Sequence, residues 1–197
     1  GGIVADFLRT DGPFENDQLF AILVDIGRAL AYAESQRLVH RDVKPDNVLV
    51  NEEGVYKLAD LGIAENIAED GQAHQVKAFG SAYYVAPEQA RGGAIDGRAD
   101  IYALGASVWH LATGKPIYEG TSRQIVYAHV HEPLPDVAAL APQLHPQLVD
   151  MLYRMLDKNP ENRPASGNEV AEEVMQIVEG KGKSKGTRGR AASTSGR

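Results

Sequence analysis

The chain has 197 residues, of which 43 % are hydrophobic and 24 % charged, a balance typical of one soluble globular domain. It contains no cysteine, which excludes disulfides, thiol chemistry, and zinc or iron–sulfur sites held by cysteine. No apolar run is long enough to cross a bilayer, and no signal peptide is visible. Because the first residue is Gly1 and not Met, we expect the true start to lie upstream.

The formal net charge of −7 is unevenly distributed along the chain. Residues 181–197 hold six of the 20 basic residues and no acidic residue, which leaves 14 basic against 27 acidic residues, a net of −13, for residues 1–180. An acidic body argues against nucleic acid as the main partner. The stretch 179–197 has nothing to bury, so we expect a disordered basic tail there after a folded domain over residues 1–178.

The first predicted element is a helix over residues 16–36, where apolar side chains recur at helical spacing. Either Asn16 or Asp17 can cap its first turn. Residues 38–47 are expected to form a loop, because Pro45 cannot lie inside a helix or a central strand.

A small β-hairpin is predicted next. Short β-like runs at 48–50 and 55–58 flank the turn sequence at 51–54, which ends in glycine. Residues 62–82 show only weak periodicity, and we expect a long loop there.

The second half of the chain is predicted to be helical. Residues 101–112 are apolar nearly all round, which indicates a buried central helix with Asp100 at its head and Gly114 and Pro116 after its end. Further helices are predicted over 121–130, 145–156 and 166–178.

The eight positions from His40 to Asn47 concentrate charged side chains between two apolar flanks. Turn chemistry alone does not require this grouping, whereas phosphoryl transfer requires a carboxylate, a cation and oxygen ligands for Mg²⁺. Asp42 can orient an attacking hydroxyl and accept its proton, Lys44 can meet the phosphate, and Asn47 offers an amide oxygen to the metal. A second metal ligand is expected after the hairpin, where Asp60 precedes a glycine that lets the chain turn sharply.

Three segments match the later half of the protein-kinase signature in order and spacing. They are His40-Arg41-Asp42-Val43-Lys44-Pro45-Asp46-Asn47, Asp60-Leu61-Gly62 and Ala86-Pro87-Glu88. Residues 1–178 therefore resemble the large lobe of a Hanks-type serine/threonine protein kinase, in a bacterial style. The resemblance implies an α+β, mainly helical fold: a kinase C-lobe with a small β-hairpin and no N-lobe.

The resemblance also implies roles for the residues of the site. Asp42 is expected to be the catalytic base, and Lys44 to contact the transferred phosphate of ATP. Asn47 and Asp60 are expected to hold Mg²⁺, and Leu49 to lie under the adenine ring.

Other positions are implied to shape or support the site. Ser81 is expected to shape the site of the substrate hydroxyl, and Leu61 replaces the more usual phenylalanine. Five further residues are expected to be structural. His40 is expected to be a buried packing residue, and Arg41 is an arginine that in such kinases often pairs with an activation-loop phosphate. Glu88 and Arg163 are expected to form an internal ion pair, and Asp100 to hold the backbone of the catalytic loop.

The chain also departs from the family pattern. It contains no G-x-G-x-x-G loop, and the strand lysine and helix glutamate of the small lobe are absent. Residues 1–8 resemble the segment just past the hinge between the lobes. Either this is a fragment of a longer gene product, whose missing N-lobe acts in cis, or the natural protein lacks half of its ATP site. In both cases we expect weak or no turnover by this chain alone.

Three functions remain open on the sequence. The leading one is ATP- and Mg²⁺-dependent phosphorylation of protein substrates, in the cytoplasm, with a membrane anchor conceivable only outside this chain. The alternatives are a non-catalytic kinase-like binding module and a small-molecule kinase of the aminoglycoside-phosphotransferase type. Lys44 and Ala86-Pro87-Glu88 favour the protein kinase over the latter.

Overall fold

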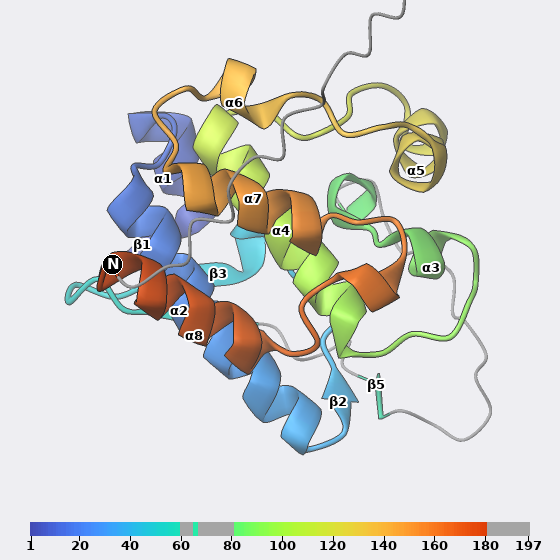
Figure 1. The fold of residues 1–197 in the computed structure, drawn as a ribbon, viewed down its shortest axis with the longest axis horizontal. Helices are drawn as coiled ribbons and strands as arrows, with labels where there is room; N and C mark the ends of the chain where they lie inside the picture. The colour runs from blue at the N-terminus through green and yellow to red at the C-terminus, as the bar shows by residue number, and fades with distance from the viewer. Residues whose placement is uncertain (60–64, 67–80, 181–197) are drawn as a thin grey trace, which may run out of the picture.

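The structure, a computed structural model, describes residues 1–59, 65–66 and 81–180. In this part of the chain, helices pack around a central helix, and a small antiparallel sheet lies against one side (Figure 1). The helices are α1 (Val4–Asp11), α2 (Asn16–Ser35), α3 (Pro87–Ala90), α4 (Gly97–Thr113), α5 (Ser122–His131), α6 (Val137–Leu140), α7 (Pro146–Met155) and α8 (Gly167–Val178). Short 3₁₀ turns are η1 (Pro45–Asn47), η3 (Ser81–Tyr84) and η4 (Pro160–Asn162).

The strands are short. β3 (Val48–Val50) pairs antiparallel with β4 (Tyr56–Leu58) on one side and with β1 (Gly2–Ile3) on the other. β2 (Leu38–Val39) pairs separately with β5 (Glu65–Asn66). The predicted hairpin is confirmed, and its turn ends at Gly54, whose φ of 78° lies in the left-handed region that glycine adopts without strain.

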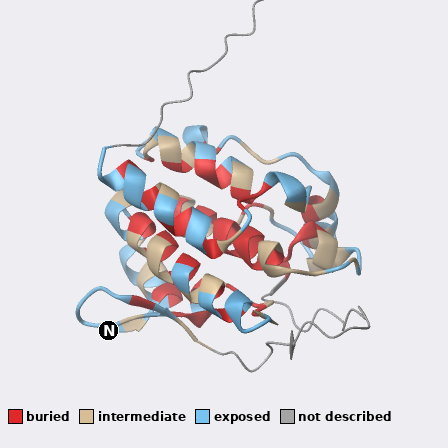
Figure 2. Cartoon of the chain, turned by 60° about the horizontal axis from the view of Figure 1, so that its bottom comes forward, coloured by how far each residue is buried: buried red, intermediate tan, exposed pale blue. Residues whose placement is uncertain are grey.

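Helix α4 is buried nearly all round, as its sequence predicts. Its core side chains include Trp109, which is 1 % exposed, and they pack against α2 and α7 (Figure 2). Asp96 caps its N-terminus by accepting a hydrogen bond from the N–H of Arg98, and Gly114 ends it with a left-handed φ. The buried helix carries Asp100 into the centre of the fold.

Helices α2 and α8 approach each other closely through two glycines. A Cβ on Gly167 would lie 2.0 Å from the carbonyl oxygen of Gly27, and a Cβ on Gly27 would lie 2.7 Å from that of Gly167. Glycine at both positions is therefore required for the observed spacing of these two helices.

All five predicted helices are confirmed to within a residue or two, apart from the earlier start of α4, at Gly97. The predicted cap of α2 is wrong: Glu15 is the N-cap, and it forms a reciprocal capping box with Gln18. Helices α1, α3 and α6 are not predicted from the sequence, and the expected loop at 38–47 contains β2 and η1. Most of the loop predicted at 62–82, and the tail from residue 181, lie outside the described residues. No helix in the described ranges has the length and apolarity required to span a membrane.

Candidate active site

The loop after β2 is held by one buried carboxylate. Oδ2 of Asp100 accepts a hydrogen bond of 2.7 Å from the backbone N–H of His40, and Oδ1 accepts one of 2.8 Å from the N–H of Arg41. Arg41 has a φ of 64°, a left-handed conformation that costs a non-glycine residue free energy. The two hydrogen bonds to Asp100 compensate this cost and fix the direction in which the loop leaves.

Asp100 is buried at the N-terminal end of α4. Burial raises the pKa of its carboxyl to about 7, and the two backbone N–H donors oppose that rise because they favour the charged form. The structure thus places Asp100 where its sequence position at the head of α4 led us to expect it.

The imidazole of His40 connects the loop to the end of the hairpin. It is fully buried, and its Nε2 lies 3.1 Å from the carbonyl oxygen of Ala59. Its Nδ1 lies 3.3 Å from the backbone N–H of Asp42. One neutral tautomer satisfies both contacts, with Nε2–H donating and Nδ1 accepting. His40 thereby positions the backbone of Asp42.

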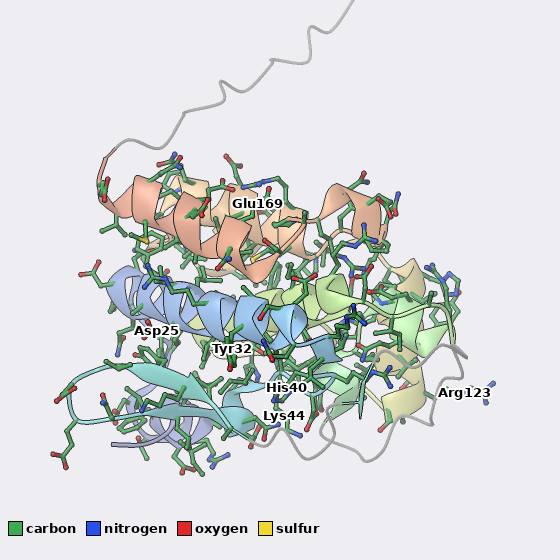
Figure 3. All side chains as sticks on the ribbon, turned by 90° about the horizontal axis from the view of Figure 1, so that it is seen from below. Asp25, Tyr32, His40, Lys44, Arg123 and Glu169 are labelled. Carbon is green, nitrogen blue, oxygen red and sulfur yellow. The ribbon has the colours of Figure 1, made fainter. Side chains whose placement is uncertain are left out.

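Asp42, Lys44 and Asn47 come together at one carboxylate oxygen. Nζ of Lys44 lies 2.6 Å from Oδ2 of Asp42, and Nδ2 of Asn47 lies 3.0 Å from the same atom. Figure 3 labels His40 and Lys44 on this loop, and η1 at its end packs against α1 and β1. The predicted cation and amide are therefore both within hydrogen-bonding distance of the predicted carboxylate.

Two hydrogen bonds fix the side chain of Asn47. Nδ2 donates to the backbone carbonyl of Asp42 at 2.8 Å and to its Oδ2 at 3.0 Å, which uses both amide hydrogens. Within the described part of the chain, no hydrogen bond uses the amide oxygen, which is the type of atom that Mg²⁺ prefers. The carbonyl of Asn47 accepts from the N–H of Ala59 at 2.8 Å, so the loop and the residue before Asp60 are joined. Asp60 itself lies outside the described residues.

Leu49 lies in the middle of β3, where it pairs with Ile3 of β1 and Lys57 of β4. Its side chain is 41 % exposed, and Ile3 is similarly exposed. Two neighbouring apolar side chains on a sheet surface form a platform of the kind on which a planar aromatic ring can rest.

Ser81 begins the turn η3, and two histidines hold the rest of that turn. Nε2 of the buried His129 lies 3.0 Å from the carbonyl oxygen of Tyr83. The hydroxyl of Tyr84 lies 2.9 Å from Nδ1 of His110. Sequence reasoning assigned no role to either histidine, because isolated histidines in helical stretches carry no recognisable motif.

A chain of buried polar contacts extends from this turn to Arg163, the residue after η4. The hydroxyl of Tyr102 donates to Nδ1 of His129 at 2.8 Å, since Nε2 of that ring donates to Tyr83. The guanidinium of Arg163 lies over the Tyr102 ring, 4.8 Å from its centroid. Arg163 in turn binds Glu88 through both carboxylate oxygens, at 2.7 and 2.8 Å. Residues from α3, α4, α5 and η3 are thus connected in one network.

Comparison with known proteins identifies the family. Residues 1–178 match the protein kinase domain family. The chain belongs to the protein kinase family. The resemblance read from the catalytic-loop residues and the prediction of a mainly helical α+β fold like a kinase C-lobe are both confirmed.

Curated relatives include serine/threonine-protein kinases of bacteria. The chain is 34 % identical to serine/threonine-protein kinase PknB of Mycolicibacterium smegmatis over 184 residues, and 33 % identical to PknB of Mycobacterium tuberculosis strain H37Rv. Each match covers 91 % of this chain and 29 % of the relative. A probable serine/threonine-protein kinase of Clostridium acetobutylicum is 32 % identical, with 90 % of this chain and 27 % of the relative covered. The chain thus spans less than a third of the length of these relatives.

Proposed function

We propose that this chain forms the part of a serine/threonine protein kinase that holds the substrate hydroxyl and the catalytic carboxylate. The observation that carries the proposal is the meeting of Lys44 and Asn47 at Oδ2 of Asp42, at 2.6 and 3.0 Å. Phosphoryl transfer depends on positioning and charge stabilisation, and this cluster supplies a proton acceptor, a cation and a metal-facing oxygen in one place.

In the proposed reaction, Asp42 orients the serine or threonine hydroxyl of the protein substrate and accepts its proton. The carboxylate is buried, and Lys44 balances its negative charge. Because Asp100 and the His40 ring fix the backbone from His40 to Asp42, little reorganisation is needed when the substrate arrives. Lys44 also lies where it can neutralise charge on the phosphoryl group.

Asn47 and Asp60 would hold Mg²⁺, which supplies charge neutralisation at the phosphates of ATP. The orientation of the Asn47 amide fits this role, since its oxygen is the atom left for a ligand. Leu49 would support the adenine ring from the sheet. The sequence contains no G-x-G-x-x-G loop, so we propose that the loop covering the phosphates and the strand lysine come from outside these 197 residues. ATP is abundant in the cytoplasm, and we place the reaction there.

The supporting residues have proposed roles as well. Ser81 would shape the site of the accepting hydroxyl from the start of η3, and the network through His129 would hold that turn in place. Arg41 would connect the loop to the activation segment, and Glu88 with Arg163 would fix the segment that follows it.

The test uses the longest natural chain that contains this sequence, with Mg²⁺ and radiolabelled ATP. Matched peptides that differ only in a serine, threonine or tyrosine acceptor, and an aminoglycoside, serve as substrates. Label on the serine and threonine peptides, with none on the other two, is the expected result. Label on the aminoglycoside alone would replace the proposal with a small-molecule kinase. The absence of label on every acceptor, with a correctly folded protein, would favour the non-catalytic binding module.

A further inference from the structure

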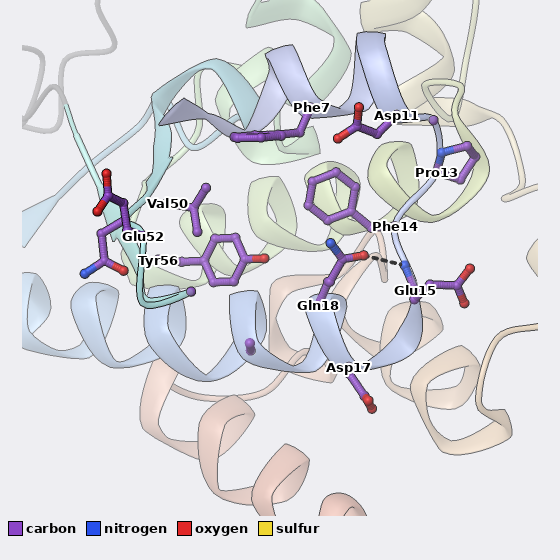
Figure 4. Close-up of a pocket in the computed structure, with 14 residues that line it drawn as sticks. Phe7, Asp11, Pro13, Phe14, Glu15, Asp17, Gln18, Val50, Glu52 and Tyr56 are labelled. Carbon is purple, nitrogen blue, oxygen red and sulfur yellow. Dashed lines mark hydrogen bonds between the residues drawn. The ribbon is translucent and has the colours of Figure 1, made fainter. Parts of the chain in front are cut away.

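A groove of about 660 Å³ opens between α1, the beginning of α2 and the β3–β4 hairpin. Figure 4 shows its apolar part, where the rings of Phe7, Phe14 and Tyr56 and the side chain of Val50 face one another. Phe14 and Tyr56 belong to the core, and Phe7 packs against it. The groove is therefore built on fixed residues of the fold.

The rim of the groove is acidic. Asp11, Glu15, Asp17 and Glu52 line it and are all exposed, whereas no lysine or arginine belongs to its lining. Glu15 already accepts a hydrogen bond from the first turn of α2, so the other three carboxylates are those available to a ligand. An apolar hollow surrounded by carboxylates is complementary to an apolar side chain flanked by cations.

The hydroxyl of Tyr56 is directed toward the interior of the groove (Figure 4). Among the residues that the structure describes, no hydrogen-bond partner of this hydroxyl is present, and the hydroxyl is open to the groove, where a ligand group can replace water as its partner. A hydroxyl placed this way inside an apolar groove is suited to hydrogen-bond a peptide carbonyl or N–H.

The groove lies on the opposite face of the sheet from Leu49. Val50 and Tyr56 are register partners and point to one face, whereas Leu49 and its partner Lys57 point to the other. An occupant of the groove would therefore leave the proposed adenine platform open.

We propose that this groove docks a segment of another protein in which lysine or arginine residues flank a bulky apolar side chain. The apolar side chain enters between Phe7, Phe14 and Tyr56, and the cations meet Asp11 and Glu52 on the rim. The tail at 181–197 carries six cations but no large apolar residue, so it matches only the rim. This docking site is separate from phosphoryl transfer and does not depend on the proposed function.

Fluorescence anisotropy tests the proposal with a short labelled peptide in which arginines flank one phenylalanine among glycines and serines. The titrated protein is the longest natural chain that contains this sequence. We expect saturable binding, weakened roughly tenfold by the double substitution Asp11→Asn and Glu52→Gln. The matched control is Glu119→Gln with Glu172→Gln, which removes the same charge from exposed positions outside the groove and should leave affinity unchanged. Tyr56→Phe removes only the hydroxyl and should weaken binding severalfold.

Two further peptides separate the parts of the proposal. A peptide in which serine replaces the phenylalanine should show no saturable binding. A peptide with the sequence of residues 181–197 should show none either. Equal affinity for the tail peptide, or tighter binding of the phenylalanine peptide after residues 181–197 are deleted, would assign the groove to the chain's own tail and overturn the proposal. Equal losses in the Asp11/Glu52 and Glu119/Glu172 variants, or no binding at all, would also overturn it. Sedimentation that shows a dimer broken by Asp11→Asn with Glu52→Gln would assign the groove to a second copy instead.

Discussion

Arg163 and Glu88 form a two-pronged ion pair, with the guanidinium buried and each carboxylate oxygen within 2.8 Å of it. Arg163→Ala would leave the charge of Glu88 poorly solvated and unpaired. We expect the free energy of unfolding to fall by roughly 3–5 kcal/mol, as measured by urea denaturation.

The control for this substitution is another arginine in an ion pair. Arg154 pairs with Glu173, and the two side chains are 41 % and 35 % exposed. Arg154→Ala should cost less than about 1 kcal/mol, because solvent screens such a pair. Similar losses in both variants would show that burial of the Arg163 pair contributes nothing specific.

Asp100 should be required for the fold of the catalytic loop. Asp100→Ala leaves the N–H groups of His40 and Arg41 without their acceptor, and we expect a loss of roughly 2–4 kcal/mol in unfolding free energy. Asp100→Asn should cost less, because its amide oxygen still accepts one of the two bonds. Asp150→Asn, an exposed change on α7, should be neutral in the same urea titrations. A neutral Asp100→Ala would contradict the proposed role.

His129 should make stability depend on pH. Burial, with Lys158 nearby as a smaller cause, lowers the pKa of its imidazole from 6.5 to about 4. The unfolded chain therefore binds a proton at a higher pH than the folded chain. The contribution of His129 to stability is present above pH 6.5 and is lost as the pH falls toward 4, by up to roughly 3 kcal/mol.

The titration of Asp100 changes stability in the opposite direction over part of this pH range. Its pKa is raised to about 7, so its contribution to stability falls as the pH rises from about 4 to about 7. The wild-type profile alone cannot separate the two groups. Urea midpoints for His129→Gln should lose the acid-side fall, whereas His131→Gln, at an exposed position of the same helix, should keep it. Identical profiles for the two variants would exclude His129 as the titrating group.

Asn47 should determine the Mg²⁺ requirement of the reaction. Asn47→Ala removes the amide oxygen available to the metal, and we expect the Mg²⁺ concentration for half-maximal transfer to rise roughly tenfold or more. Asp46→Asn, at an exposed neighbouring position, should leave it unchanged. A lower maximal rate for Asn47→Ala at an unaltered Mg²⁺ requirement would assign Asn47 to orienting Asp42 alone.

Much of the fold follows from local sequence. The apolar pattern of α4 and the turn at Gly54 required no knowledge of distant residues, because periodicity and turn chemistry determine them locally. Helix α1 has only eight residues and no N-cap hydrogen bond, so its helical pattern spans little more than two turns and is a weak signal. Glu15 caps α2 instead of Asn16, whose side chain contacts residues 143 and 145, far away in sequence.

The candidate site also has a part that local sequence predicts and a part that depends on distant residues. Asp42, Lys44 and Asn47 are close in sequence and belong to one motif, so their meeting could be predicted. The contacts of His129 with Tyr83 and Tyr102 join three separate elements and have no motif. The groove near Tyr56 likewise depends on packing between α1, α2 and the hairpin, which no local pattern reveals.

The central claim is that Asp42 is the base for phosphoryl transfer. Its most direct test is the intact mass of the longest natural chain after incubation with Mg²⁺ and ATP, for the wild type, Asp42→Asn and the control Asp46→Asn. The account predicts added phosphate masses in the wild type and in Asp46→Asn, and none in Asp42→Asn. Equal phosphate addition in the Asp42→Asn variant would contradict it.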